Sequence, residues 1–179
     1  SLEAGKLCND GRRYHEGYVT GHSMQLARFA LQVRAGLRST GWAVPDYLME
    51  LGTELFERAR VDGWRRTDGA PGFSTAVNDE GDPMPGEDEH QQWVVCEGVC
   101  ATVAVRRAML DDGHRIDEVE HFEHCYRSFV DYIHDYLIAQ PGRWIRRLGP
   151  HNESVQPAKS SRLDVYHAIQ AMLAIRVPL

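Results

Sequence analysis

The sequence lacks several features that mark whole classes of protein. No apolar run approaches the ~18 residues of a membrane-spanning helix, and no N-terminal segment has the charged, apolar and small-residue order of a signal peptide. Positive charge is not in excess, since 20 Lys and Arg stand against 26 Asp and Glu, for a net charge of −6. These absences argue against a membrane or nucleic-acid partner, because phosphate contacts need a basic surface. A cytoplasmic protein is the default expectation.

Cysteine is scarce, with four residues in 179, and the absence of a Cys-x-x-Cys pair argues against a zinc site. Cys96 and Cys100 lie four residues apart in a helical pattern, where small buried thiols are common. We therefore expect reduced core cysteines, with disulfides as the alternative for a secreted chain. His121, His124 and Cys125 form a His-x-x-His-Cys cluster. No carboxylate motif completes a metal site there, so we predict a solvated helix face and no bound metal.

The sequence does contain a series of helical patterns. Apolar periodicity predicts helices over about 21–39, 46–62, 91–112, 116–138 and 163–175. The third is apolar nearly all round and should be buried on most sides, whereas the fourth has one apolar stripe and should be an outer helix.

Glycine and proline exclude a helix between residues 63 and 90. Here we predict a long loop carrying a small β-hairpin, in which 72–75 and the stretch near Met84 flank a turn at 78–81. Long loops in compact domains are usually functional. The expected fold class is therefore all-α, with small β-hairpins in the long loops.

Three side chains share a position within this pattern. His22, Trp93 and His167 each lie at or near the start of an apolar helix, 71 and 74 residues apart. Regular spacing of this size indicates stacked helical hairpins. In such an array the loops and the N-termini of the inner helices gather at one end, so we expect the three side chains to converge on one pocket.

Four segments, distributed over most of the chain, resemble the motifs of a single known family. Residues 21–28, Gly-His-Ser-Met-Gln-Leu-Ala-Arg, are similar to the family's Gly-His-x-x-Glu-Trp-Ala-Arg helix start. Gly72-Phe73 followed by 79–83 resembles its hairpin loop, and residues 93–97 match a Trp-x-x-x-Glu motif. Residues 164–171, Asp-Val-Tyr-His-Ala-Ile-Gln-Ala, resemble the Asp-x-Tyr-His-Ala-Leu-Gln-Ala segment of the mannose and sulfoquinovose isomerase branch. This octapeptide is the most specific of the four segments, which together resemble the N-acylglucosamine 2-epimerase superfamily.

The resemblance implies an α/α toroid and an enzyme of carbohydrate metabolism. Family members are about twice this length and close an (α/α)6 barrel, so residues 1–179 are expected to form a single domain that is the C-terminal part of such a barrel. A natural truncation is the alternative. In that case the exposed inner faces of the helices predict a homodimer that buries them.

The same resemblance implies the chemistry of an aldose–ketose isomerase. The reaction moves a proton between neighbouring carbons through an enediolate, and histidine titrates in the range that suits this step. His22 would be the proton-transfer base and His167 the acid/base that opens the sugar ring, although the two roles could exchange. Glu97 would orient a histidine or bind a sugar hydroxyl, and inside a helix that is apolar all round its charge needs a partner. No cofactor is implied, and a monosaccharide is the expected partner.

The expected substrate-binding residues are Trp93, Arg12, Gln25 and Tyr166. Trp93 would stack on a sugar face, and Arg12 or its neighbour Arg13 would stabilise the enediolate charge. Each residue also has a purely structural interpretation. Trp93 would then be a core residue, and the arginines solvated loop charges.

One departure from the family pattern bears on activity. Gln25 stands where the family carries Glu, and an amide cannot carry a proton. Residues 159–163 also lack the usual Trp and Gly-Lys-Pro. Two alternatives therefore stand beside a mannose-like isomerase. One is a 2-epimerase of the same fold, which returns the proton to the same carbon, and the other is an inactive carbohydrate-binding α/α protein.

Overall fold

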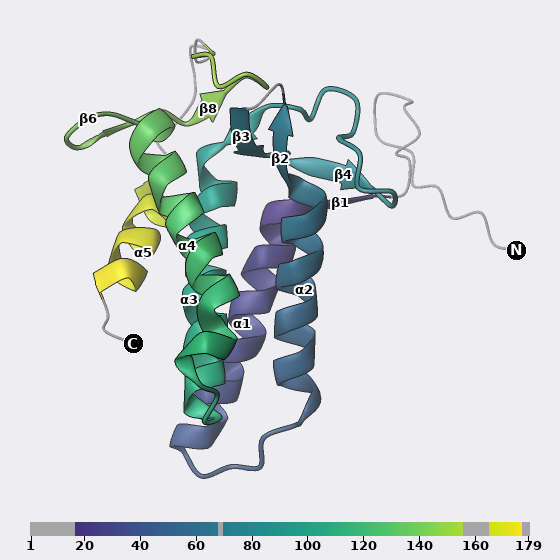
Figure 1. The fold of residues 1–179 in the computed structure, drawn as a ribbon, viewed down its shortest axis with the longest axis vertical. Helices are drawn as coiled ribbons and strands as arrows, with labels where there is room; N and C mark the ends of the chain where they lie inside the picture. Colours follow the sequence, from purple (N-terminus) through teal and green to yellow (C-terminus); the bar gives the residue numbers. More distant parts are fainter. Residues whose placement is uncertain (1–16, 68–69, 156–164, 177–179) are drawn as a thin grey trace, which may run out of the picture.

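The computed structural model describes residues 17–67, 70–155 and 165–176. Its α-helices are α1 (Thr20–Ser39), α2 (Tyr47–Gly63), α3 (Gln92–Asp111), α4 (Glu120–Tyr132) and α5 (Val165–Arg176). In Figure 1, α1, α3 and α5 run in one direction and α2 and α4 in the other. Among the described residues, none of the helices has the length and apolar character that a membrane crossing requires.

The helices form an inner row and an outer pair. α3 lies between α1 and α5, while α2 packs on α1 and α4 packs on α3. The sequence explains this order, because most residues of α3 are buried whereas α4 buries one stripe that includes Phe122 and Phe129. An apolar helix gains most by lying in the middle of the row. The predicted buried third helix and outer fourth helix are confirmed.

The predicted helix over 116–138 is divided into three kinds of helical turn. A 3₁₀ turn, η1 (Ile116–Val119), leads into α4, and a π turn, η2 (Ile133–Leu137), follows it. A capping box closes the start, where the Glu118 carboxylate accepts from the Arg115 backbone N–H at 2.6 Å. Leu137 is fully buried at the end of the π turn, so the apolar stripe continues through the change of helix type.

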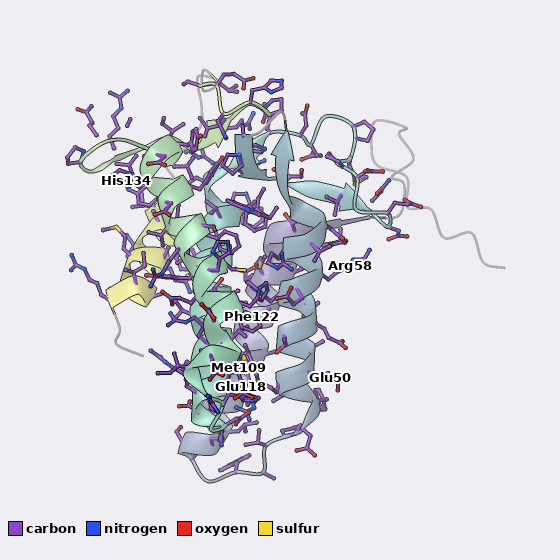
Figure 2. The ribbon with its side chains drawn as sticks, in the orientation of Figure 1. Glu50, Arg58, Met109, Glu118, Phe122 and His134 are labelled. Atoms are coloured by element: carbon purple, nitrogen blue, oxygen red, sulfur yellow. The ribbon has the colours of Figure 1, made fainter. Side chains whose placement is uncertain are left out.

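The strands are short and pair only two by two. They are β1 (Gly17–Val19), β2 (Trp64–Thr67), β3 (Ala70–Phe73), β4 (Ala76–Asn78), β5 (His90–Gln91), β6 (Ile138–Gln140), β7 (Arg143–Trp144) and β8 (Arg147–Leu148). The antiparallel pairs are β1–β4, β2–β3, β5–β8 and β6–β7. All gather at the end where α1 and α3 begin (Figure 1), and Glu50, Met109 and Glu118 mark the opposite end (Figure 2).

The predicted hairpin within 63–90 is corrected in its pairing. Gly72 pairs with Arg65 of β2 and not with the stretch near Met84. The Met84 N–H instead donates to the carbonyl of Ala76 at 3.0 Å. The turn at 78–81 is present, with the Gly81 N–H bonded to the Asn78 carbonyl at 3.0 Å.

An aromatic cluster explains this choice of partner. The Trp64 ring lies 4.9 Å from that of Phe73 and 4.8 Å from that of Phe129, and the two phenyl rings lie 5.1 Å apart. Pairing β2 with β3 buries Trp64 and Phe73 together against α4. Large aromatic side chains dominate core energetics, so their packing decides the strand register.

The thiols of Cys96, Cys100 and Cys125 are buried. The predicted place of Cys96 and Cys100 in the core is confirmed. The burial of Cys125, which is 6% exposed, corrects the solvated helix face predicted for it, because α4 packs this side of the helix inward. Cys8 lies outside the described residues. Burial raises the pKa of Cys100 to about 12.

Candidate active site

The inner row places the three predicted residues at corresponding positions. His22 is the third residue of α1, Trp93 the second of α3 and His167 the third of α5. Because α3 lies between the other two, the indole contacts both imidazoles, with ring centroids 5.3 Å from His22 and 5.7 Å from His167. The three side chains thus lie side by side, as predicted, whereas the cleft between α1, α3 and α5 is lined by other residues.

A glycine allows Trp93 to lie against α1. A Cβ atom built on Gly21 would come within 2.3 Å of Cζ3 of the Trp93 ring, so no larger residue fits without displacing the indole. The Trp93 Nε1–H also donates to the Gln91 side-chain oxygen at 2.8 Å. These two contacts hold a half-buried aromatic platform between the histidines.

Glu97 lies one turn beyond Trp93 and is 1% exposed. Its predicted need for a partner is met by Arg28, whose Nη2 lies 3.0 Å from Oε2 and whose Nε–H donates to Oε2 at 3.1 Å. Two-pronged pairs of this kind offset much of the cost of removing both charges from water. Arg28 was not among the predicted site residues. Its signal was its place as the last residue of the 21–28 motif.

The other oxygen of Glu97 faces the imidazole on α5. His167 Nε2 lies 3.6 Å from Glu97 Oε1, and the Gln25 amide donates to the same oxygen at 3.5 Å. A glutamate at position 25 would place a second carboxylate beside Glu97, where like charges oppose ionisation of both. The amide avoids that repulsion, so the site holds one buried carboxylate neutralised by one arginine.

A chain of side chains on α5 ends at the rim of the site. With the Gln170 amide in the orientation that satisfies both of its polar atoms, its oxygen accepts from Arg28 Nη1 at 2.6 Å and its nitrogen donates to the Tyr166 hydroxyl at 2.9 Å. The Tyr166 ring is exposed and lies 4.9 Å from the His167 ring. Tyr166 therefore borders His167 on the solvent side.

Two further sequence predictions concern Arg12 and the cluster of His121, His124 and Cys125. Arg12 lies outside the described residues. His121 and Cys125 share a face of α4 as predicted, with Nε2 and Sγ 3.8 Å apart, but His121 Nε2 lies 2.9 Å from a carboxylate oxygen of Glu57 on α2. In the part of the chain that the structure describes, no three His, Cys, Asp or Glu side chains gather into a metal-binding group.

A cleft of about 280 Å³ lies between α1, α3 and α5. Arg28 and Gln170 line its end beside the site, and Leu31, Leu173 and the buried Cys100 line its walls. Arg28 and Gln170 therefore belong to both the site and the cleft, whereas His22, Trp93 and His167 do not line the cleft. Two imidazoles, an aromatic platform and an arginine-anchored carboxylate suit proton transfer on a small polar molecule.

An inner row of helices backed by an outer layer, with hairpin loops over the inner N-termini, defines part of an α/α toroid. The family model for N-acylglucosamine 2-epimerase (GlcNAc 2-epimerase) matches residues 9–171, so the chain belongs to this family. It is 30% identical over 164 residues to a D-mannose isomerase of Pseudomonas cannabina pv. alisalensis, a match that covers 91% of this chain. The chain spans about 37% of the length of that relative.

Solved structures show the same fold. A D-mannose isomerase superposes with a TM-score of 0.72 at 19% identity, covering 92% of this chain and 37% of that one. A cellobiose 2-epimerase from Bacillus thermoamylovorans B4167 gives 0.59 at 10% identity, covering 96% and 40%. A sugar epimerase from a ruminal bacterium gives 0.55 at 19% identity, covering 96% and 41%.

Proposed function

We propose that residues 1–179 are the C-terminal part of a sugar isomerase that interconverts a mannose-like aldose and its ketose. The observation that carries this proposal is the contact of His22 and His167 with one indole, with Glu97 behind His167. Membership of the family and the D-mannose isomerase relative support a sugar as the substrate.

In the proposed reaction the two histidines carry protons at different atoms of the sugar. His22 is exposed at the mouth of the site, where a neutral imidazole can take the proton from C2 and return it to C1. His167, held beside Glu97, takes the proton of the C1 hydroxyl and gives a proton to the ring oxygen as the bond between C1 and that oxygen breaks, which opens the ring. A neighbouring carboxylate stabilises an imidazolium and fixes its orientation, so Glu97 suits the histidine that must be protonated in turn.

The other site residues hold the sugar. Trp93 offers an aromatic face between the histidines, and apolar sugar faces stack on such rings. Gln25 and Tyr166 offer an amide and a hydroxyl to sugar hydroxyls at the edge of the site. Gln25 cannot carry a proton, so proton transfer in this proposal rests on the histidine pair alone. Arg12 is proposed to stabilise the enediolate.

A 2-epimerase is the second candidate. It uses the same pair of bases but returns the proton to C2 from the opposite face of the sugar. The fold shared with the two epimerase structures supports the epimerase as an alternative to the isomerase. An inactive sugar-binding protein is the third, and the replacement of a carboxylate by Gln25 favours it.

Incubation with mannose in D₂O separates these candidates, because NMR identifies the product and the deuterated carbon. The assay uses the longest native polypeptide that contains residues 1–179. We expect it to produce a deuterated ketose. His22→Ala and His167→Ala should each lower the rate by about 10²–10⁴-fold, the usual contribution of an acid/base group. The matched control is His134→Ala on η2, whose side chain is 81% exposed (Figure 2).

Each other result selects another conclusion. Deuterated C2-epimer would replace the isomerase with the epimerase. Saturable binding of mannose without deuterium exchange would identify a binding protein. An exchange rate that survives both histidine substitutions would overturn the catalytic assignment altogether.

A further inference from the structure

A second cluster of polar side chains lies beneath the loops that cover the site. His90 is 4% exposed and Tyr132 is 3% exposed. His90 Nδ1 lies 2.9 Å from the Asn152 side-chain oxygen, and the Tyr132 hydroxyl donates to that oxygen at 2.8 Å and lies 3.3 Å from His90 Nδ1. We call His90, Tyr132 and Asn152 the His90 hub.

The hub joins segments that are far apart in sequence. The Asn152 amide also donates to the Pro71 carbonyl at 2.8 Å, which fastens the 149–154 loop to β3. A Cβ atom on Gly72 would come within 2.1 Å of the His90 ring, so the imidazole lies directly against the β3 backbone. Asn152 has φ +62°, a left-handed conformation that Asn tolerates better than most residues. Gly72 and the left-handed backbone of Asn152 thus both favour the packing of the 149–154 loop and His90 against β3.

The hub also lies at the entry to α3. His90 and Gln91 form β5, which pairs with Leu148 and Arg147 of β8, and α3 begins at the next residue. The start of α3 has no side-chain cap, and the N–H of its first residue donates to the Arg146 carbonyl at 2.9 Å. The direction in which α3 begins is therefore set by β5 and the loop beside it.

Trp93 depends on that direction. It is the second residue of α3, and its indole N–H is held by Gln91, the neighbour of His90. A rotation of β5 would turn Gln91 and the indole together. It would therefore change the distance from the indole to His22 on one side and to His167 on the other. A buried polar network imposes one geometry where apolar packing tolerates several.

We propose that His90, Tyr132 and Asn152 are positioning residues that set the orientation of the Trp93 platform. Their importance for turnover rests on the proposed function, whereas their effect on Trp93 does not. Between Tyr132 and Trp93 there is no direct ring contact, so we ascribe the expected effect of the hydroxyl on the indole to the hub and β5. The Tyr132 ring also contacts Trp64, with centroids 5.5 Å apart, and Tyr132→Phe keeps that contact.

The test measures the environment of the Trp93 indole directly. The chain has four tryptophans, and labelling with 5-fluorotryptophan gives each its own ¹⁹F NMR signal, with Trp93→Phe identifying the one of interest. We expect Tyr132→Phe and Asn152→Gly to shift or split the Trp93 signal. Tyr132→Phe keeps the ring in the core, and Asn152→Gly keeps the positive φ. The matched control, Tyr126→Phe on α4, removes a hydroxyl outside the hub and should leave the signal unchanged.

A rescue variant separates positioning from general packing. His90→Asn places an amide N–H near the place of the imidazole Nδ1–H and should restore the wild-type Trp93 signal more fully than His90→Leu, which is apolar. A Trp93 signal that stays at its wild-type position in folded Tyr132→Phe and Asn152→Gly would overturn the proposal. The ¹⁹F readout needs no sugar, so its outcome is separate from that of the D₂O experiment.

Discussion

At the scale of single residues, α1 contains two glycines with opposite surroundings. A Cβ atom at Gly21 would collide with the Trp93 indole, whereas one at Gly36 would meet nothing within 4 Å. Gly21 is therefore needed to make room for the Trp93 indole. Gly36 lowers the stability of the helix and makes room for no neighbouring side chain. The two positions form a matched pair on one helix.

We predict that Gly21→Ala and Gly36→Ala shift the free energy of unfolding in opposite directions. Gly21→Ala should destabilise the chain by about 1–3 kcal/mol, the usual cost of overpacking, and should displace Trp93. Gly36→Ala should stabilise it by up to about 1 kcal/mol, the difference in helix propensity. Urea unfolding measures both. Equal effects of the two substitutions would contradict the close contact at Gly21.

Arg28 carries a prediction about a buried charge. Arg28→Met leaves the Glu97 carboxylate buried without its cation, and removing one partner of a buried ion pair costs about 3–5 kcal/mol. The control is Arg127→Met, which breaks an exposed pair with Glu123 on α4 and should change stability little. Thermal and urea unfolding compare the two variants. Similar small effects would show that Glu97 finds another partner.

Cys100 carries a prediction about reactivity. Since burial raises the pKa of its thiol to about 12, almost no thiolate is present at pH 8, and the thiolate is the reactive species. Modification by a water-soluble disulfide reagent should therefore be slow in the folded chain and fast in urea. Mass spectrometry of the modified peptide gives the rate. Rapid labelling of folded protein at Cys100 would contradict the burial.

At the scale of elements, the His90 hub gives the junction of β5 and α3 a pH dependence. Burial lowers the pKa of His90 below its ordinary value of 6.5. The hydrogen bond to Asn152 and the carboxylates of Glu153 and Asp88 partly oppose this, and His151 adds to it. Below pH 6.5 the unfolded chain takes up a proton that the folded chain excludes. The stabilising contribution of neutral His90 is thus complete above pH 6.5 and is lost as the pH falls.

We therefore expect the free energy of unfolding to decrease between pH 7 and pH 5 more steeply in the wild type than in His90→Asn. Urea titrations at a series of pH values measure the two slopes. His124→Asn, a change on the exposed face of α4, serves as the control and should keep the wild-type slope. Identical slopes for the wild type and His90→Asn would mean that the pKa of His90 is the same in the folded and the unfolded chain.

The helices were predictable from the sequence, and the strand pairings were not. An apolar residue every three or four positions predicts α1, α2 and α3 to within one residue at each end, because a helix face is a local property. The predicted helix over 116–138 covers η1, α4 and η2 together. The pairing of β2 with β3 depends on Trp64 meeting Phe129, which is 65 positions away in the chain. The π turn after α4 was likewise missed, since apolar spacing alone does not separate it from α-helix.

At the scale of the whole molecule, the inner row has uncovered apolar side chains at both edges. Leu26, Phe29 and Val33 form an exposed stripe on α1, and Ile169 and Met172 are exposed on α5. Contiguous exposed apolar surface marks an interaction site. The proposal that residues 1–179 are part of a larger barrel accounts for it, because further helices would cover both edges.

We predict that the isolated chain of residues 1–179 self-associates through these edges. Sedimentation should show a dimer or larger species, and Phe29→Glu combined with Ile169→Glu should shift it to monomer. The control is Trp42→Glu, which removes a still more exposed apolar side chain, 72% accessible, from the α1–α2 connection. A stable monomer with the wild-type sequence would show that the edges do not bind each other.

By itself the sequence determined the helices, their order of burial, the family and the equal positions of His22, Trp93 and His167, because these are properties of local periodicity and motif. Only the tertiary structure decided what surrounds them. It placed Arg28 on Glu97, pressed Trp93 against Gly21 and assembled the His90 hub. Each of these contacts joins residues from different elements, and the packing of whole helices brings them together.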